Sequence, residues 1–272
     1  SLVTNGLNPV FADIDAQTLN INPNIIENMI TKSTSAIVPV HVFSNACEIE
    51  RIDAIAKKNN LKVIYDAAHS FNVKYKGASI LNYGDISAIS FHATKVFHSI
   101  EGGALIINND ELVEKARYLI NFGIKNTEEI PELGTNAKMN EFEAAMGLCV
   151  LNDIQELNKK RKNIYYLYLQ ELEKYVTLQK MNSHSVQNHS YFPIILKNTK
   201  QLKRVEDGLK KENIYARRYF YPSLDTLKYI NPKQYCKISR DISSKILCLP
   251  MYPELETINV KKICKIIKNN LC

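Results

Sequence analysis

The sequence predicts an α/β protein with a large domain, built on a mostly parallel sheet covered by helices, and a smaller C-terminal α+β domain. Two observations lead to this fold class. In the first half, apolar segments alternate with amphipathic helical segments, and continuously apolar strands are typical of a parallel sheet covered on both faces. After the polar segment at residues 179–190, the order becomes strand, helix, strand, helix.

Each expected element rests on its own pattern. Helices are expected where apolar residues recur every three to four positions, and strands where short apolar runs end in polar residues. In the large domain we expect strands at 8–14, 35–43, 61–68, 84–92 and 102–108, and helices at 22–32, 48–60, 110–123 and 140–175. In the smaller domain we expect strands at 189–197 and 214–222, and helices at 199–213 and 258–270. We place the large domain at 1–160, and a linking helix with the small domain at 161–272.

Composition excludes several classes of protein. The net charge is +7, but the lysines are scattered along presumed helix faces, so a nucleic-acid partner is not expected. No apolar run approaches the roughly 18 residues that cross a bilayer, and no export signal opens the chain. The six cysteines lack C-x-x-C spacing, so we expect reduced thiols, no metal site and a cytoplasmic location.

Asp66 and His69 are the first candidates for chemistry. Asp66 follows an apolar run, and ligands of α/β sheets bind at the carboxyl ends of strands. A carboxylate there requires a cation or a hydrogen-bond donor, although a helix cap or turn would explain it equally well. His69 comes three residues later and could reach the same site, or it could be structural.

Lys95 lies just beyond an expected strand on which Ser90 and His92 alternate with apolar residues. A lysine among apolar groups loses its proton more easily, and an uncharged amine forms a Schiff base with an aldehyde. A pyridoxal phosphate enzyme requires such a lysine, a carboxylate for the pyridine nitrogen and donors for the phosphate. Lys95, Asp66 and Ser90 are of these types, although an isolated lysine could also be an ordinary surface residue.

Several segments resemble one known family in their order along nearly the whole chain. They include "VIYDAAHSF" from residue 63, "GDISAISFHATK" from 84, "EGGALIINNDEL" from 101 and "GTNAKMNEFEAAMGL" from 134. They resemble the DegT/DnrJ/EryC1/StrS family of PLP-dependent nucleotide-sugar aminotransferases, which have aminotransferase fold type I. The resemblance implies transamination of a dTDP-linked keto-6-deoxy sugar, with L-glutamate as amino donor and pyridoxamine phosphate as an intermediate form of the cofactor. The product would be an amino sugar for glycan biosynthesis.

The resemblance also implies roles for the candidate residues near the cofactor. Lys95 would form the Schiff base and move the proton, and Asp66 would pair with the pyridine nitrogen. Ser90 would bind the phosphate. His69 stands where many members carry glutamine, near the phenolic oxygen of the cofactor.

Further residues are implied for the partner subunit and the substrate. Asn136 and Lys138 would reach the phosphate held by a partner subunit, so the resemblance implies a homodimer with shared active sites. Arg217, Tyr219 and Tyr221 could contact the sugar or diphosphate, although strand alternation at a domain interface would explain them as well.

Two departures from the family keep other functions open. The family begins with a segment that carries a phosphate-binding turn and a stacking aromatic residue, so we expect the large domain to be incomplete at its N-terminus and sequence to precede residue 1. The histidine usual after the segment at 214–222 is absent at Leu224 and Asp225. One alternative is a truncated, non-catalytic protein that acts as a binding or regulatory module. Another is a sugar dehydratase of the same fold, which would carry histidine in place of Lys95.

Overall fold

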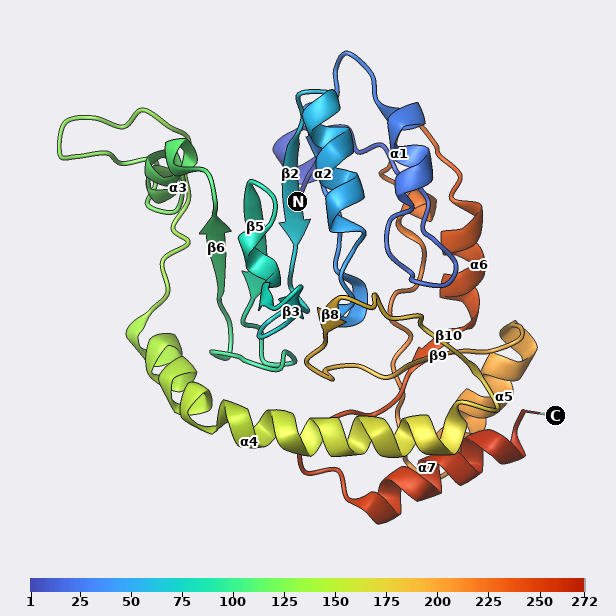
Figure 1. The fold of residues 1–272 in the computed structure, drawn as a ribbon. Coiled ribbons are helices and arrows are strands. Elements are labelled where there is room, and N and C mark those ends of the chain that lie inside the picture. Colours follow the sequence, from blue (N-terminus) through green and yellow to red (C-terminus); the bar gives the residue numbers. More distant parts are fainter. Residues whose placement is uncertain (272) are drawn as a thin grey trace.

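The computed structural model describes residues 1–271 and contains a four-stranded sheet in the order β1-β2-β5-β6 (Figure 1). Its strands are β1 (Ala36–Ile37), β2 (Lys62–Asp66), β5 (Ile86–Ser90) and β6 (Gly103–Ile107). β1, β2 and β5 are parallel, and β6 is antiparallel to β5. The carboxyl ends of β2 and β5 therefore lie at the same edge of the sheet, where Asp66 pairs in register with Ala88.

α2, α5 and α7 each bury apolar residues at helical spacing, whereas α3 buries none. α2 buries Ile49, Ile52 and Ala56, and its terminal Lys57 and Lys58 complement the negative end of the helix dipole. The helices are α1 (Pro23–Met29), α2 (Ile49–Lys58), α3 (Val113–Leu119), α4 (Glu141–Leu172), α5 (Thr199–Lys210), α6 (Lys237–Lys245) and α7 (Thr257–Asn269). Short 3-10 turns are η1 (Val3–Asn5), η2 (Val42–Ser44), η3 (Ile80–Asn82), η4 (Asp110–Leu112) and η5 (Leu224–Thr226).

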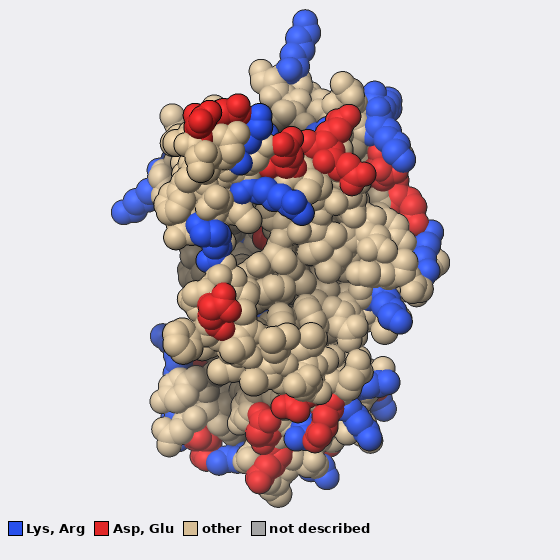
Figure 2. Space-filling view, turned by 90° about the vertical axis from the view of Figure 1, so that its left-hand side faces the viewer, with Lys and Arg blue, Asp and Glu red and all other residues tan. Residues whose placement is uncertain are grey.

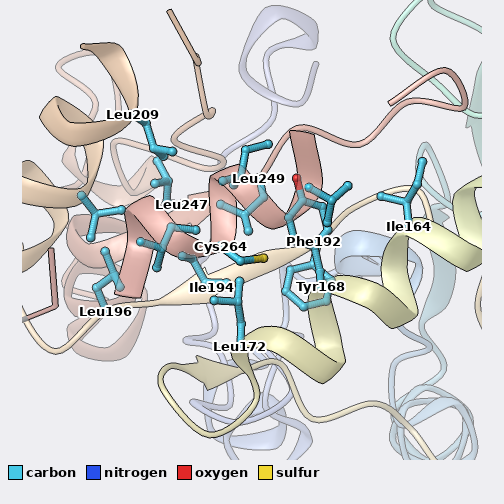
Figure 3. Packing of buried hydrophobic residues seen from close by; sticks show 14 of the residues in the cluster. Ile164, Tyr168, Leu172, Phe192, Ile194, Leu196, Leu209, Leu247, Leu249 and Cys264 are labelled. Atoms are coloured by element: carbon cyan, nitrogen blue, oxygen red, sulfur yellow. The ribbon is translucent and has the colours of Figure 1, made fainter. Parts of the chain in front are cut away.

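The C-terminal part has its own antiparallel sheet and core. The sheet order is β10 (Ile246–Cys248), β9 (Pro193–Ile195) and β7 (Thr177–Leu178). Figure 3 shows Tyr168 and Leu172 of α4 packed with residues of these strands and the surrounding helices. Each large apolar side chain buried in this way stabilises the fold by roughly 1.5–3 kcal/mol. A further small sheet joins β3 (Lys74–Tyr75), β4 (Ala78–Ser79) and β8 (Ser185–Val186), so it links the two halves of the chain.

α4 is the element that connects the two parts. It runs unbroken for 32 residues, and Figure 1 shows it passing from the side of β6 and α3 to α7. Its N-terminus is fixed by a capping box, in which Asn140 accepts from the Glu143 N–H and Glu143 accepts from the Asn140 N–H. α4 passes residue 160 without interruption and therefore belongs to both parts. The domain boundary expected between residues 160 and 161 stays a prediction.

Three expected strands differ from the structure. Residues 8–14 and 214–222 form only single bridges, Ile14 to Ile21 and Arg217 to Cys248. The expected strand at 35–43 is interrupted after β1, because Pro39 has no N–H for the ladder. The chain then turns in η2, where Phe43 has a φ of 55°.

The parallel strands β2 and β5 are not equally buried on both faces. In β2 and β5 alternate side chains are buried, and the others are exposed or partly covered. Of the helices in the described part of the chain, none has the length and apolar character required to cross a membrane.

Candidate functional site

The site is built where β2 and β5 end side by side. Asp66 is the last residue of β2 and Ser90 the last of β5. The Asp66 backbone is fixed on one side, where its N–H donates to Pro39 O at 2.9 Å and its carbonyl accepts from His41 N–H at 3.1 Å. The Asp66 side chain accepts only from the Ala68 N–H, at 3.0 Å, among the residues described, and it is exposed. The carboxylate is thus held on rigid backbone and remains accessible.

Lys95 reaches the same place from the loop after β5. Its N–H donates to His92 O at 2.9 Å, and its side chain is partly buried. Burial lowers the pKa of Lys95, the Asp66 carboxylate opposes this shift, and the Arg217 guanidinium adds to it. Three charges from distant parts of the sequence therefore lie within electrostatic range of one another, and the amine is easier to deprotonate than an exposed lysine.

His69 forms the buried wall of this site. Its Nδ1 accepts from the Phe43 N–H at 3.2 Å, and its ring lies 4.5 Å from Tyr191 and 5.7 Å from Phe220, centroid to centroid. Burial, with a contribution from Lys95, lowers the pKa of His69 to about 3. The imidazole is therefore neutral near pH 7.

Ser90 supplies a hydroxyl beside Lys95. Its Oγ accepts from the His92 N–H at 3.3 Å, which leaves the hydroxyl proton available for another acceptor. In the neighbouring His92, Nδ1 forms a hydrogen bond with the Thr94 hydroxyl at 2.9 Å, and Nε2 lies 3.4 Å from a Glu101 carboxylate oxygen. His92 is therefore engaged outside the group formed by Asp66, His69 and Lys95.

Arg217 and Tyr219 join the site, whereas Tyr221 points elsewhere. Arg217 Nη1 donates to the Tyr219 hydroxyl at 3.1 Å, and Tyr219 lies 6.1 Å from Tyr191. The Tyr221 ring instead packs on the Arg218 guanidinium, at 3.7 Å from the ring centroid. Arg218 in turn donates to the carbonyls of Ser243 and Ser244 in α6. Among the arginines in the described residues, Arg217 is the one whose charge acts on Lys95.

The residue that replaces the expected family histidine is structural in this chain. Asp225 is 2% exposed and accepts from Arg240 Nε at 2.6 Å, Cys236 N at 2.9 Å and Ser223 Oγ at 2.5 Å. These three donors satisfy the carboxylate and lower its pKa against the effect of burial. Asp225 is therefore a buried carboxylate that is engaged in contacts within the C-terminal part.

Asn136 and Lys138 lie together on the segment between α3 and α4. Lys138 Nζ donates to Asn136 Oδ1 at 2.7 Å and to Asn121 Oδ1 at 2.9 Å, and it lies 4.5 Å from the Phe122 ring centroid. Both side chains are exposed on the segment between α3 and α4. Neither is among the groups that shift the pKa of Lys95.

The side of the molecule that contains β6, α3 and the start of α4 carries exposed apolar side chains. Figure 2 looks onto the side with β6, α3 and the start of α4, and it shows a broad uncharged area bordered by both signs of charge. Large exposed residues on β6, on α4 and on the segment between α3 and α4 include Leu105, Ile130, Leu133, Phe142, Leu148 and Leu151. We call these six residues the apolar face. Their exposed fractions include 97% for Leu133 and 86% for Phe142.

Sequence reasoning missed three aromatic residues of the site. The sequence places Phe43 and Tyr191 in expected strands without a role at the site, and Phe220 lies between the candidates Tyr219 and Tyr221. Their only local signal is aromatic character, which is more often a feature of the core. Their grouping around His69 depends on three segments that lie far apart in the sequence.

The residues at Lys95 fit pyridoxal phosphate. The site offers an amine of lowered pKa, an accessible carboxylate at a strand end, a hydroxyl with a free proton and a neutral imidazole. This donor set matches an aldehyde, a pyridine nitrogen, a phosphate and a phenolic oxygen.

Comparison with known proteins gives a consistent family. The model of the DegT/DnrJ/EryC1/StrS aminotransferase family matches residues 1–268. A dTDP-4-amino-4,6-dideoxy-D-glucose transaminase of Shigella dysenteriae is 45% identical over 264 residues, which cover 94% of this chain and 72% of that protein. A transaminase of the same name from Escherichia coli is 37% identical over 279 residues, covering 98% and 75%. The crystal structure of DesI in the presence of its TDP-sugar product superimposes with a TM-score of 0.92 at 29% identity, covering 98% of this chain and 70% of that chain.

Proposed function

The chain belongs to the DegT/DnrJ/EryC1/StrS aminotransferase family, and we propose that it transfers an amino group from L-glutamate to a dTDP-linked keto-6-deoxy sugar. The amino sugar formed would serve glycan biosynthesis. The observation that carries this proposal is the grouping of Lys95, Asp66 and Arg217, in which the lysine pKa is lowered. The two most similar relatives described above, named as transaminases of a dTDP-linked 4-amino-4,6-dideoxy sugar, support the substrate class.

Lys95, Asp66, Ser90 and His69 would hold pyridoxal phosphate. When bound, this cofactor supplies a protonated pyridine ring that takes up the electron pair released at the substrate carbon. Asp66 would keep the pyridine nitrogen protonated, because a carboxylate at hydrogen-bond distance favours the charged form. The Ser90 hydroxyl would donate to a phosphate oxygen, and neutral His69 would donate to the phenolic oxygen.

Lys95 would have two roles in each half-reaction. Its lowered pKa gives a larger neutral fraction near pH 7, which is the form that attacks an aldehyde carbon. Once the amino substrate has displaced it, the free amine can take a proton from the substrate carbon and return it to the cofactor carbon. Burial favours this exchange, because a lowered pKa lets the amine give up its proton more readily than an exposed lysine does.

Arg217 and Tyr219 would bind the anionic part of a substrate. Both substrates are anions, and a guanidinium matches carboxylate and phosphate oxygens with paired donors. The Tyr219 hydroxyl holds the guanidinium at 3.1 Å, which limits its freedom before substrate binds. Tyr221 is not one of the proposed substrate-binding residues, because its ring packs on Arg218.

We also propose a homodimer in which each chain completes the other site. The apolar face is typical of a surface that is covered in an assembly. Asn136 and Lys138 are exposed on the segment between α3 and α4, next to this face, and neither shifts the pKa of their own Lys95. A partner that covers the face could therefore receive Asn136 and Lys138 at its cofactor phosphate.

The test uses the purified chain with pyridoxal phosphate. Binding should give a visible absorption band, and borohydride reduction should fix a pyridoxyl group on Lys95 that peptide mapping locates. Glutamate should then convert the cofactor to its amino form, and a dTDP-linked 4-keto-6-deoxyhexose should convert it back. Lys95→Ala is the control, since it should abolish the adduct without loss of fold.

The outcomes separate the proposed function from its alternatives. Adducts spread over many surface lysines, with no conversion by glutamate, would favour the non-catalytic reading. Binding of pyridoxamine phosphate with loss of water from the sugar, and no amine transfer, would favour a dehydratase. Lys95 opposes the dehydratase, because the resemblance implies histidine at that position in dehydratases of this fold.

A further inference from the structure

The turn at residues 42–45 is held in an unfavourable backbone conformation next to His69. Phe43 and Ser44 have φ values of 55° and 65°, in the left-handed region that favours glycine. This conformation is unfavourable for a residue with a Cβ atom unless its surroundings compensate. The side chains are fully or nearly fully buried, at 2% and 0% exposure.

Asn20 supplies the compensation by bracketing this turn. Its Oδ1 accepts from the Val42 N–H at 2.9 Å, and its Nδ2 donates to Asn45 O at 3.0 Å. Asn20 is itself only 2% exposed, so these bonds have little competition from water. Gln179 supports the same turn from another side, since its Nε2 donates to Val42 O at 3.1 Å.

The turn determines which nitrogen of His69 carries the proton. The Phe43 N–H points at Nδ1 at 3.2 Å, and a nitrogen that accepts a hydrogen bond cannot be protonated. The neutral ring must therefore carry its proton on Nε2. No hydrogen-bond partner of Nε2 occurs among residues 1–271, and Nε2 is not a fully buried atom, so it retains accessible surface. His69 also lies within electrostatic range of Lys95.

We infer that Asn20 is a positioning residue for His69: by holding the turn at 42–45, it fixes His69 as an Nε2–H donor facing the Lys95 site. The acceptor would be an oxygen of the bound aldehyde cofactor, and this part rests on the proposed function. The amide N–H of a glutamine could serve the same purpose, whereas a histidine provides a defined donor only when its tautomer is fixed. Asn20 lies in a segment distant in sequence from every residue assigned to the site.

The test reads the tautomer in the cofactor-free full-length chain labelled with ¹⁵N-histidine. Protonated and unprotonated ring nitrogens are separated in two-bond ¹H–¹⁵N spectra, and His69→Gln identifies the signals. We expect a single Nε2–H tautomer in the wild type and a mixture of both tautomers in Asn20→Ala. His41 is an internal reference, because its Nδ1 accepts from the Cys47 N–H at 3.1 Å in a separate contact.

Two further variants keep the test decisive. Asn20→Asp retains the acceptor for the Val42 N–H and should largely restore the wild-type tautomer. If Asn20→Ala does not fold, Gln179→Leu loosens the same turn through Val42 O and should give the same mixture. A wild-type Nδ1–H tautomer, or an unchanged Nε2–H signal in the loosened variants, would overturn the inference.

A binding measurement tests the link to the cofactor. Loss of one defined hydrogen bond should weaken pyridoxal phosphate binding by about fivefold to tenfold in Asn20→Ala. In a His69→Ala background the Asn20→Ala change should have no further effect, because its influence passes through His69. Equal losses in both backgrounds would overturn this link. A wild-type chain without affinity for the cofactor would refute the proposed function, while the tautomer result would stand separately.

Discussion

At the scale of single residues, Lys95 is governed by three opposing effects. Burial disfavours its ammonium form, Asp66 favours that form, and Arg217 disfavours it. Burial is the largest effect, so the pKa of Lys95 is lowered despite the nearby carboxylate. Substitution of one or the other charged neighbour should therefore lower or raise the pKa of Lys95 while the lysine itself is unchanged.

We predict opposite effects of two substitutions on Lys95. Asp66→Asn should lower the pKa of Lys95 further, and Arg217→Gln should raise it, each by up to about one unit. The measurement is the pH dependence of the pyridoxyl adduct trapped by borohydride at Lys95, whose midpoint should move to lower and higher pH respectively. Arg218→Gln is the matched control, because Arg218 packs on Tyr221 and does not act on Lys95. A midpoint that moves the same way in both variants would contradict this electrostatic account.

A second prediction concerns the stability of the fold in acid. Burial lowers the pKa of His41 to about 3, below its ordinary value of 6.5. The unfolded chain therefore takes up a proton on this residue first, and stability decreases as the pH falls from about 6.5 toward 3. The loss should reach about 2 kcal/mol by pH 5 for this residue.

Urea unfolding at pH 7 and pH 5 tests the acid effect. His41→Asn should be less stable than the wild type at pH 7, because the His41 ring packs on Tyr65 at 4.4 Å. The variant should nevertheless lose about 2 kcal/mol less than the wild type between the two pH values. His92→Asn, at a half-exposed histidine, is the matched substitution control. If the wild type and His41→Asn lost equal free energy of unfolding between pH 7 and pH 5, His41 would not be the group that controls the acid effect.

At the scale of elements, the N-terminal and C-terminal halves of α4 have different surroundings. Its C-terminal half buries Ile164, Tyr168 and Leu172 in the core of the C-terminal part. Its N-terminal half leaves Phe142 and Leu148 exposed, at 86% and 66%. A helix that is exposed and apolar over two turns is typical of an interface with another chain.

We predict that Phe142→Glu weakens self-association. A charge placed in a covered apolar interface loses hydration without a partner, which costs several kcal/mol of association free energy. Sedimentation velocity should show the wild type as a dimer and the variant as mostly monomer at the same concentration. Ile258→Glu on α7 is a control, since Ile258 is 70% exposed but lies outside the apolar face. A dimer that persists in Phe142→Glu would place the interface elsewhere.

The elements also show how far sequence reasoning reached. The family resemblance and the α/β fold class are confirmed by the family match and the structural similarity. Helices with clear periodicity, such as α2 and α7, formed within two residues of their expected ends. The strand expected at 35–43 is shorter than expected, because Pro39 interrupts it after β1 and the chain turns at Phe43. Apolar character does not reveal this left-handed turn, which depends on Asn20 and Gln179.

The same limit applies to the site. Asp66, Ser90 and Lys95 were predictable, because each lies at or just beyond a strand end and the sheet brings such ends together. Tyr191 and Phe220 were not, because they reach His69 from the C-terminal part through packing that no local pattern specifies. The placement of Asn136 and Lys138 requires a second chain, so their role stays a prediction.

At the scale of the whole molecule, the proposed site is divided between two chains. The Lys95 group comes from strand ends of one chain, while Asn136 and Lys138 lie on the exposed segment between α3 and α4. If each chain supplies one part, then a defect in either part can be complemented by a partner that carries the other. A monomeric enzyme could not show such complementation.

We therefore predict that two inactive variants restore activity when produced together. Lys95→Ala lacks the reactive amine, and the double variant Asn136→Ala, Lys138→Ala lacks the groups given to the partner. Half of the randomly formed dimers would be mixed and each would have one intact site, so about a quarter of wild-type transaminase activity should return. Each variant produced alone is the control. Activity in the mixture no greater than the sum of the controls would show that Asn136 and Lys138 act within their own chain or not at all.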